Sequence, residues 1–264
     1  MAGGEPLRLY HEVHPGRGPH LLLVHGFLSS RAQWLLNLEA LARVCQPVVV
    51  ELWGHGRSPA PDDPSLYHPD AYIQQFEGLR RQLGADRWAI CGQSLGAALT
   101  LRYALACPER IIAHVFTNSM SALAEEGWEE RIRPLMEQQA RRLLQDGHRA
   151  LAEHPLNPAR GSRLPTAARE ALVADLALSD PKGIAYTGLY TVPQSSARGR
   201  VGQNRVPSLL VVGEREERFQ EHRRYAEAHM PHLRVVALDA GHAVNLEAAG
   251  PFNQAVIEFL STLT

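Results

Sequence analysis

Residues Trp88–Leu99, with the sequence WAICGQSLGAAL, form the stretch that decides the fold. The apolar run Trp88–Cys91 predicts a buried strand, and the apolar residues after Gly96 predict a helix. Gly92 and Gly96 stand two positions before and after Ser94, where a tight strand-to-helix turn has no room for larger side chains. The pattern therefore predicts a serine whose hydroxyl stands clear of the sheet, beside the free N–H groups of a helix N-terminus.

Apolar runs and helical patterns alternate along most of the chain. Strands are expected at Leu7–Val13, Leu21–Val24, Val48–Leu52, Trp88–Cys91, Ile111–Thr117, Leu209–Gly213 and Leu233–Leu238. Helices are expected at Ala32–Arg43, Ala71–Leu83, Leu95–Cys107 and Glu217–Met230, with a last one after Pro251. This alternation predicts an α/β fold with a doubly wound, mostly parallel sheet, because parallel neighbours need helical crossovers.

The segment 123–205 interrupts the alternation. Its helical stretches, Trp128–Leu144 and Thr166–Leu178, are separated by prolines, and no buried strand is predicted between them. We therefore expect a core domain made of residues 1–122 and 206–264, with 123–205 inserted as a helical cap or lid. The alternative is an elaborated crossover without a functional role.

Composition and charge narrow the classes of partner. Lys and Arg total 27 against 28 Asp and Glu, which gives no reason to expect a nucleic-acid partner. The three cysteines have no pairing or metal-like spacing, residues 1–6 do not resemble a signal peptide, and no run approaches the roughly 20 apolar residues of a membrane span. We expect a cytoplasmic protein with a small-molecule substrate, no membrane partner, no cofactor and no metal; the oligomeric state stays open.

Two loops contain candidate partners for Ser94. His242 follows the last predicted strand in a loop of small residues, from which an imidazole can reach the carboxyl edge of the sheet and act as general base. After the strand that ends at Val24, the backbone N–H of Phe27 is placed to form an oxyanion hole with that of Leu95. His25 is expected to hold this loop rather than to act as a base.

The acid that would orient His242 is less clearly marked. A hydroxyl nucleophile needs a base, and the base needs a carboxylate that fixes its tautomer. Glu214, Glu216 and Glu217 all follow the strand that ends at Gly213, and the residues alone leave the three open. Asp239 is expected to end its strand and serve the turn. Asn118, which follows the strand Ile111–Thr117, is set aside because it carries no charge.

Together these features resemble the α/β-hydrolase superfamily. The resemblance rests on His25-Gly26-Phe27, Gly54-His55-Gly56-Arg57-Ser58, the turn at Ser94, Gly213-Glu214-Arg215-Glu216 and Gly241-His242. It implies the α/β-hydrolase fold and the chain order serine, acid, histidine. It also implies Glu216 as the acid, at a position where aspartate is commoner, and a structural role for Glu51.

Ester hydrolysis through an acyl-enzyme on Ser94 is the reaction that the resemblance implies first. Haloalkane dehalogenation and epoxide hydrolysis are disfavoured, because those nucleophiles are normally aspartates. Local similarity to the menaquinone-pathway synthase of 2-succinyl-6-hydroxy-2,4-cyclohexadiene-1-carboxylate, and to carbon–carbon bond hydrolases, leaves a lyase or carbon–carbon hydrolase open. A non-catalytic ligand-binding homologue is the alternative of another class.

Four aromatic residues are candidates for a substrate pocket. These are Trp53 on a core loop and Trp128, Tyr186 and Tyr190 in the predicted cap. The alternative for each is that it packs the cap onto the core.

Overall fold

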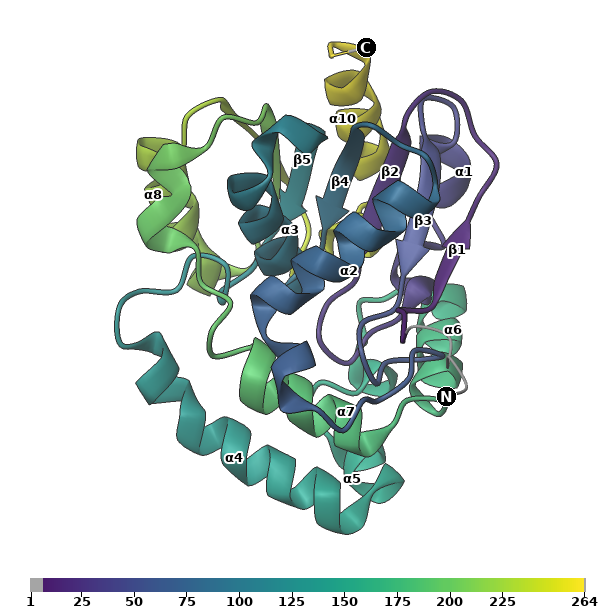
Figure 1. Ribbon diagram of the computed structural model, residues 1–264, viewed down its shortest axis with the longest axis vertical. Coiled ribbons are helices and arrows are strands. Elements are labelled where there is room, and N and C mark those ends of the chain that lie inside the picture. The colour runs from purple at the N-terminus through teal and green to yellow at the C-terminus, as the bar shows by residue number, and fades with distance from the viewer. Residues whose placement is uncertain (1–6, 264) are drawn as a thin grey trace, which may run out of the picture.

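The computed structural model describes residues 7–263, in which a seven-stranded sheet has helices on both faces (Figure 1). The strands are β1 (His11–Val13), β2 (His20–Val24), β3 (Gln46–Val50), β4 (Trp88–Gly92), β5 (Ile111–Thr117), β6 (Ser208–Gly213) and β7 (Leu233–Leu238). Their order is β1-β3-β2-β4-β5-β6-β7; β1 pairs antiparallel with β3, and every other pairing is parallel. The predicted doubly wound, mostly parallel sheet is confirmed. Residues 1–6, which entered the argument about a signal peptide, lie outside the described part.

Helices cover both faces of the sheet because successive strand residues point in opposite directions. The core helices are α1 (Leu38–Leu41), α2 (Pro69–Gln82), α3 (Leu95–Ala106), α8 (Gln220–His229) and α10 (Ala249–Ser261). On one face Leu22 packs in the same cluster as Phe76 of α2, and on the other Leu23 packs with Phe252 of α10. Figure 1 shows α2 and α3 in front of the sheet, with α1 and α10 behind it. No helix among residues 7–263 is long and apolar enough to cross a membrane.

Several predicted elements differ from the observed ones. The strand expected at Leu7–Val13 is confined to His11–Val13, and the helix expected at Glu217–Met230 begins as a 3₁₀ turn, Glu217–Phe219. The helix expected at Ala32–Arg43 is divided into a 3₁₀ turn, Arg31–Trp34, and α1, and the Asn37 side chain between them bonds the Asn245 carbonyl. The strand expected to reach Leu52 ends at Val50. Beyond it the Leu52 N–H donates to a histidine side chain instead of a neighbouring strand. The partners of Asn37 and Leu52 are distant in the sequence, so hydrophobic periodicity does not reveal these contacts.

The helices of the inserted segment lie beyond the carboxyl ends of the parallel strands (Figure 1). They are α4 (Trp128–Asp146), α5 (His148–Glu153), α6 (Thr166–Leu176) and α7 (Pro181–Tyr186), and residues 123–205, all of them described, contain no strand. At its two ends the segment packs on the core, since Leu123, Ala197 and Val201 belong to the cluster around Phe116. Only the part between these ends extends over the edge of the sheet where the candidate loops meet.

Candidate active site

Ser94 occupies a strained turn between β4 and α3. Its backbone has φ 53° and ψ −116°, a conformation that L-residues rarely adopt. A Cβ on Gly92 would lie 2.3 Å from the Gly96 carbonyl oxygen, and one on Gly96 would lie 2.1 Å from the Val24 carbonyl oxygen. The glycines therefore allow the backbone to approach itself closely, as the sequence predicts for this turn.

Glu216 is the glutamate that reaches His242. Both of its carboxylate oxygens lie 3.0 Å from His242 Nδ1, and Asn118 Nδ2 donates to Oε2 at 2.7 Å. Burial opposes ionisation of Glu216, but the hydrogen bond and charge of His242, the Asn118 amide and the charge of Arg218 outweigh it. The pKa of Glu216 is therefore held below its ordinary value, and the pair leaves the other ring nitrogen, Nε2, for chemistry.

Asn118 is a residue that sequence reasoning set aside because it carries no charge. Its side-chain amide donates to the Gly213 carbonyl at 3.0 Å and accepts from the Gly213 N–H at 2.9 Å. It thus fixes the end of β6 while also bonding Glu216. The available signal was its place directly after β5, since β5 and β6 are neighbours and their carboxyl ends meet.

Ser94 and His242 line one cavity of about 510 Å³. The cavity is bounded by the loop around Phe27 and, on the cap side, by residues 155–158 and 160–164. Gln93, next to the serine, donates through Nε2 to the His242 carbonyl at 3.3 Å. Within residues 7–263 no hydrogen bond joins Ser94 Oγ to the imidazole, as is common in sites without substrate.

The loop after β2 brings a second group of donors to the serine. A Cβ on Gly26 would lie 2.9 Å from Ser94 Cβ, so the loop backbone is close to the nucleophile. The N–H groups of Phe27 and Leu95 donate to no acceptor in the described part of the chain. His25 is fully buried; its Nε2 accepts from the Leu52 N–H, and burial lowers its pKa to about 3. A neutral His25 that bonds the backbone has the loop-holding geometry expected from the sequence.

The four aromatic residues proposed for substrate binding lie away from this cavity. Trp53 is fully buried in a core cluster, and Trp128 lines a separate cavity near the start of α4. Tyr186 and Tyr190 face each other edge to face with ring centroids 5.5 Å apart, against the core. The expectation is therefore corrected: none of the four lines the cavity of Ser94, because the rings are buried between cap and core or lie at the far end of the cap.

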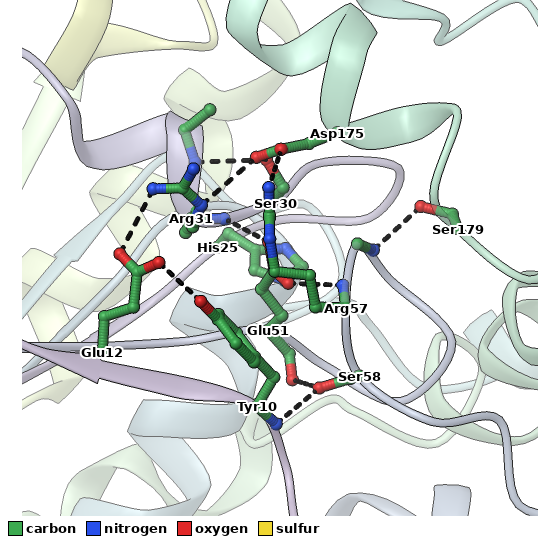
Figure 2. Close-up of polar contacts among 12 residues, drawn as sticks. Tyr10, Glu12, His25, Ser30, Arg31, Glu51, Arg57, Ser58, Asp175 and Ser179 are labelled. Atoms are coloured by element: carbon green, nitrogen blue, oxygen red, sulfur yellow. Dashed lines mark hydrogen bonds and ion pairs between the residues drawn. The ribbon is translucent and has the colours of Figure 1, made fainter.

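A network of buried charges ties the cap to the loops beside the cavity (Figure 2). Glu51, fully buried, accepts from the Arg57 N–H at 2.6 Å and the Arg31 N–H at 3.3 Å. Asp175 of α6 accepts from the Arg57 guanidinium at 2.7 Å and from Ser30 Oγ at 2.8 Å. Burial raises the pKa of Glu51. Glu51 thus bonds the backbone of two loops, which is the kind of structural contact that the sequence indicated. Together with Asp175, this network links α6 to the segment that follows Phe27.

Comparison with known proteins identifies the family of the fold. A family profile described as "alpha/beta hydrolase fold" matches residues 19–249. The chain belongs to this family. It is 27% identical over 257 residues to a putative 2-succinyl-6-hydroxy-2,4-cyclohexadiene-1-carboxylate synthase of Bacillus subtilis, covering 94% of this chain and 93% of that protein. It is 28% identical to the putative carbamate hydrolase RutD of Pseudomonas savastanoi, covering 97% and 100%.

Solved structures agree on the fold. The crystal structure of an enol-lactonase from Burkholderia xenovorans superimposes with a TM-score of 0.80 at 22% identity, covering 96% of each chain. The family match and the relatives named as hydrolases support an enzyme of this fold. Among the residues that the structure describes, no group of three or more His, Cys, Asp or Glu side chains is arranged to hold a metal ion.

Proposed function

We propose that the protein is a serine hydrolase that cleaves a carboxylic ester of a small to medium organic substrate. The observation that carries this proposal is the pairing of His242 Nδ1 with Glu216 at 3.0 Å, in the cavity that also holds the strained Ser94. The carboxylate fixes the tautomer in which Nε2 accepts a proton, and the turn presents a hydroxyl to be deprotonated. In this proposal Ser94 is the nucleophile, His242 the base and Glu216 the acid.

The reaction proceeds in two halves. Ser94 Oγ attacks the acyl carbon while His242 Nε2 takes its proton, and the N–H groups of Phe27 and Leu95 stabilise the oxyanion. Collapse of this intermediate expels the alcohol, which receives the proton from His242. Water, deprotonated in turn by His242, then attacks the acyl-enzyme and releases the carboxylic acid and Ser94.

A lyase or carbon–carbon bond hydrolase with the same three residues is the second candidate. Two observations favour it: similarity to a protein named as a carboxylate synthase extends over 94% of this chain, and Arg160 and Arg163 line the Ser94 cavity. Neither guanidinium has an ion pair or hydrogen bond within the described residues, so both can meet an anionic substrate. In the lyase reaction Ser94 and His242 would remove a proton from a substrate carbon rather than transfer an acyl group.

The deciding experiment is turnover of p-nitrophenyl esters from acetate to decanoate, together with labelling by a fluorophosphonate probe. Ser94→Ala is expected to lose at least about 10³-fold in kcat and all labelling, with an unchanged circular dichroism spectrum. Ser261→Ala, an exposed serine on α10, is the matched control and should retain both. The chain length with the highest kcat/KM would measure the acyl part of the pocket.

The other outcomes separate the alternatives. Labelling of Ser94 without ester turnover would favour the second candidate, to be tested with the menaquinone-pathway intermediate and with ring-cleavage diketones. Absence of both labelling and turnover would favour a ligand-binding homologue. Full activity of Ser94→Ala would overturn the assignment of the nucleophile.

A further inference from the structure

Glu247 contacts the backbone on both sides of His242. It ends the short helix α9 (Val244–Glu247), and its side chain is only 7% exposed. Oε2 accepts from the Gly241 N–H at 2.8 Å, and Oε1 accepts from the Ala243 N–H at 3.3 Å. One carboxylate therefore holds the amides that precede and follow the proposed base.

The same carboxylate is bonded to the loop of the proposed acid. Arg215, the residue before Glu216, places NH2 3.1 Å from Glu247 Oε2, and its NH1 lies 3.1 Å from Asp239 Oδ1. The backbone adds a parallel link, since the Arg215 N–H donates to the Ala240 carbonyl at 2.9 Å. Glu247 and Arg215 thus join the two loops on which the His242–Glu216 distance depends.

The His242 ring has little packing of its own. Its side chain is 47% exposed, and its hydrogen bonds within residues 7–263 are those to Glu216. A half-exposed ring on a loop keeps its direction only if the loop backbone is fixed. A Cβ on Gly241 would lie 2.9 Å from Glu247 Oε1, so any larger residue at position 241 would crowd this carboxylate.

We infer that Glu247 is a positioning residue that fixes the His242 loop, and through Arg215 its spacing from Glu216. The inference rests on the proposed role of His242 as general base. A displacement of about 1 Å in a catalytic group can cost about 10²-fold in rate, because the reacting atoms leave their productive geometry. Loss of the Glu247 carboxylate should therefore lower kcat while substrate binding is largely kept.

The test compares Glu247→Ala and Glu247→Gln with the matched control Asp239→Asn. Asp239 is bonded to the same Arg215 guanidinium but is 85% exposed, and it does not bond the amides beside His242. Glu247→Ala is expected to lose about 10²-fold in kcat with KM within about threefold. Glu247→Gln keeps one acceptor oxygen and should lose about tenfold, and Asp239→Asn should stay within twofold.

A spectroscopic measurement keeps the inference separate from the proposed function. The low-field proton resonance of His242 Nδ1–H bonded to Glu216, assigned by its absence in His242→Gln, does not require turnover. It should broaden or shift upfield in Glu247→Ala and persist in Asp239→Asn. If Ser94 proves unreactive the proposed function fails, yet this resonance still tests the positioning role.

Three results would overturn the inference. One is an unchanged resonance and kcat in Glu247→Ala, and another is a loss confined to KM, which would mean that Glu247 contacts the substrate. The third is an equal loss in Asp239→Asn, which would assign the effect to the charge of Arg215. Glu247→Gln, which preserves size, provides the same comparison if the alanine variant does not fold.

Discussion

At the scale of single residues, the three glutamates after β6 differ in where their carboxylates lie. Glu214 is 57% exposed and lies 4.0 Å from an arginine on α8, and Glu217 is also exposed, whereas Glu216 bonds His242. Glu216→Gln is expected to lower kcat by about 10³- to 10⁴-fold, because the amide favours the wrong imidazole tautomer. Ester turnover of the three single variants at pH 8 is the measurement.

Glu214→Gln and Glu217→Gln serve as controls for this prediction and should stay within about threefold of the parent protein. Because the pKa of Glu216 is held below its ordinary value, its carboxylate is ionised throughout the neutral range. The acidic limb of the kcat/KM profile should therefore not report Glu216. If Glu217→Gln loses activity while Glu216→Gln keeps it, the acid is Glu217 instead of Glu216.

The residues that sequence analysis located have signals within their own neighbourhood. Ser94 stands between two glycines in a strand-to-helix turn, and His242 follows the last strand in a loop of small residues. Glu247 has no such signal, and the place of Asn118 after β5 does not reveal which residue it bonds, because both act through partners distant in the sequence, Arg215 and Glu216. Contacts of this kind exist only in the folded chain.

At the scale of elements, the apolar runs predicted all seven strands. β2 to β6 are buried along almost their whole length, as parallel strands covered on both faces are, whereas the edge strands β1 and β7 are partly exposed. The sequence also predicted that residues 123–205 contain no strand, and the structure has none there, but the direction of these helices over the cavity was not predictable. That direction depends on contacts such as Gly183 of α7 against Gly54, where a Cβ on Gly183 would lie 2.4 Å from Gly54 Cα. A glycine–glycine approach between a helix and a loop leaves no periodic pattern. The same limit explains why the sequence did not show that the four aromatic residues lie away from the Ser94 cavity.

The docking of the cap yields a prediction at this scale. Asp175→Ala removes the carboxylate that α6 places between Arg57 and Ser30 (Figure 2), and it should lower the free energy of unfolding by about 2 kcal/mol. Arg57 keeps Glu51 as a partner and is partly exposed, so the loss stays below that of a fully isolated buried charge. Urea unfolding measures the change, and limited proteolysis shows whether the cap is the part that opens.

Lys182→Ala is the matched control for the cap. Lys182 of α7 also bonds a residue outside segment 123–205, Asp62, at 2.6 Å, but that carboxylate is 94% exposed. An exposed pair contributes less than about 1 kcal/mol, so this variant should be near the parent in both assays. Equal effects of the two variants would mean that burial of Asp175 does not determine how the cap is held.

At the scale of the whole molecule, buried histidines make stability depend on pH. Burial lowers the pKa of His25 and His114 to about 3 and that of His55 and His154 to about 4. Above about pH 7 these side chains are neutral in both folded and unfolded chains and do not affect the balance. Below about pH 6.5 these histidines bind protons in the unfolded chain but not in the folded one, so the free energy of unfolding falls as the pH falls.

The size of this effect follows from proton counting. Each histidine contributes about 1.4 kcal/mol per pH unit once its unfolded form is charged, so four contribute about 5 kcal/mol per unit between pH 5.5 and 4.5. Glu51 has a raised pKa and acts in the opposite direction, by at most one proton. Since domains are stable by about 5–15 kcal/mol, the protein should unfold between about pH 5.5 and 4.

Urea unfolding at pH 8, 7, 6 and 5.5 measures the onset of this slope, which should reach about 4–5 kcal/mol per unit between pH 6 and 5.5. His154→Gln removes one of the four protonation sites from the cap, where the side chain is 5% exposed, and should reduce the slope by about a quarter. As the pH falls, the free energy of unfolding of the variant should therefore rise relative to that of the parent, because the variant has one protonation site fewer in its unfolded chain. A slope of about 1 kcal/mol per unit or less in the parent protein would mean that these histidines accept protons while the chain is folded.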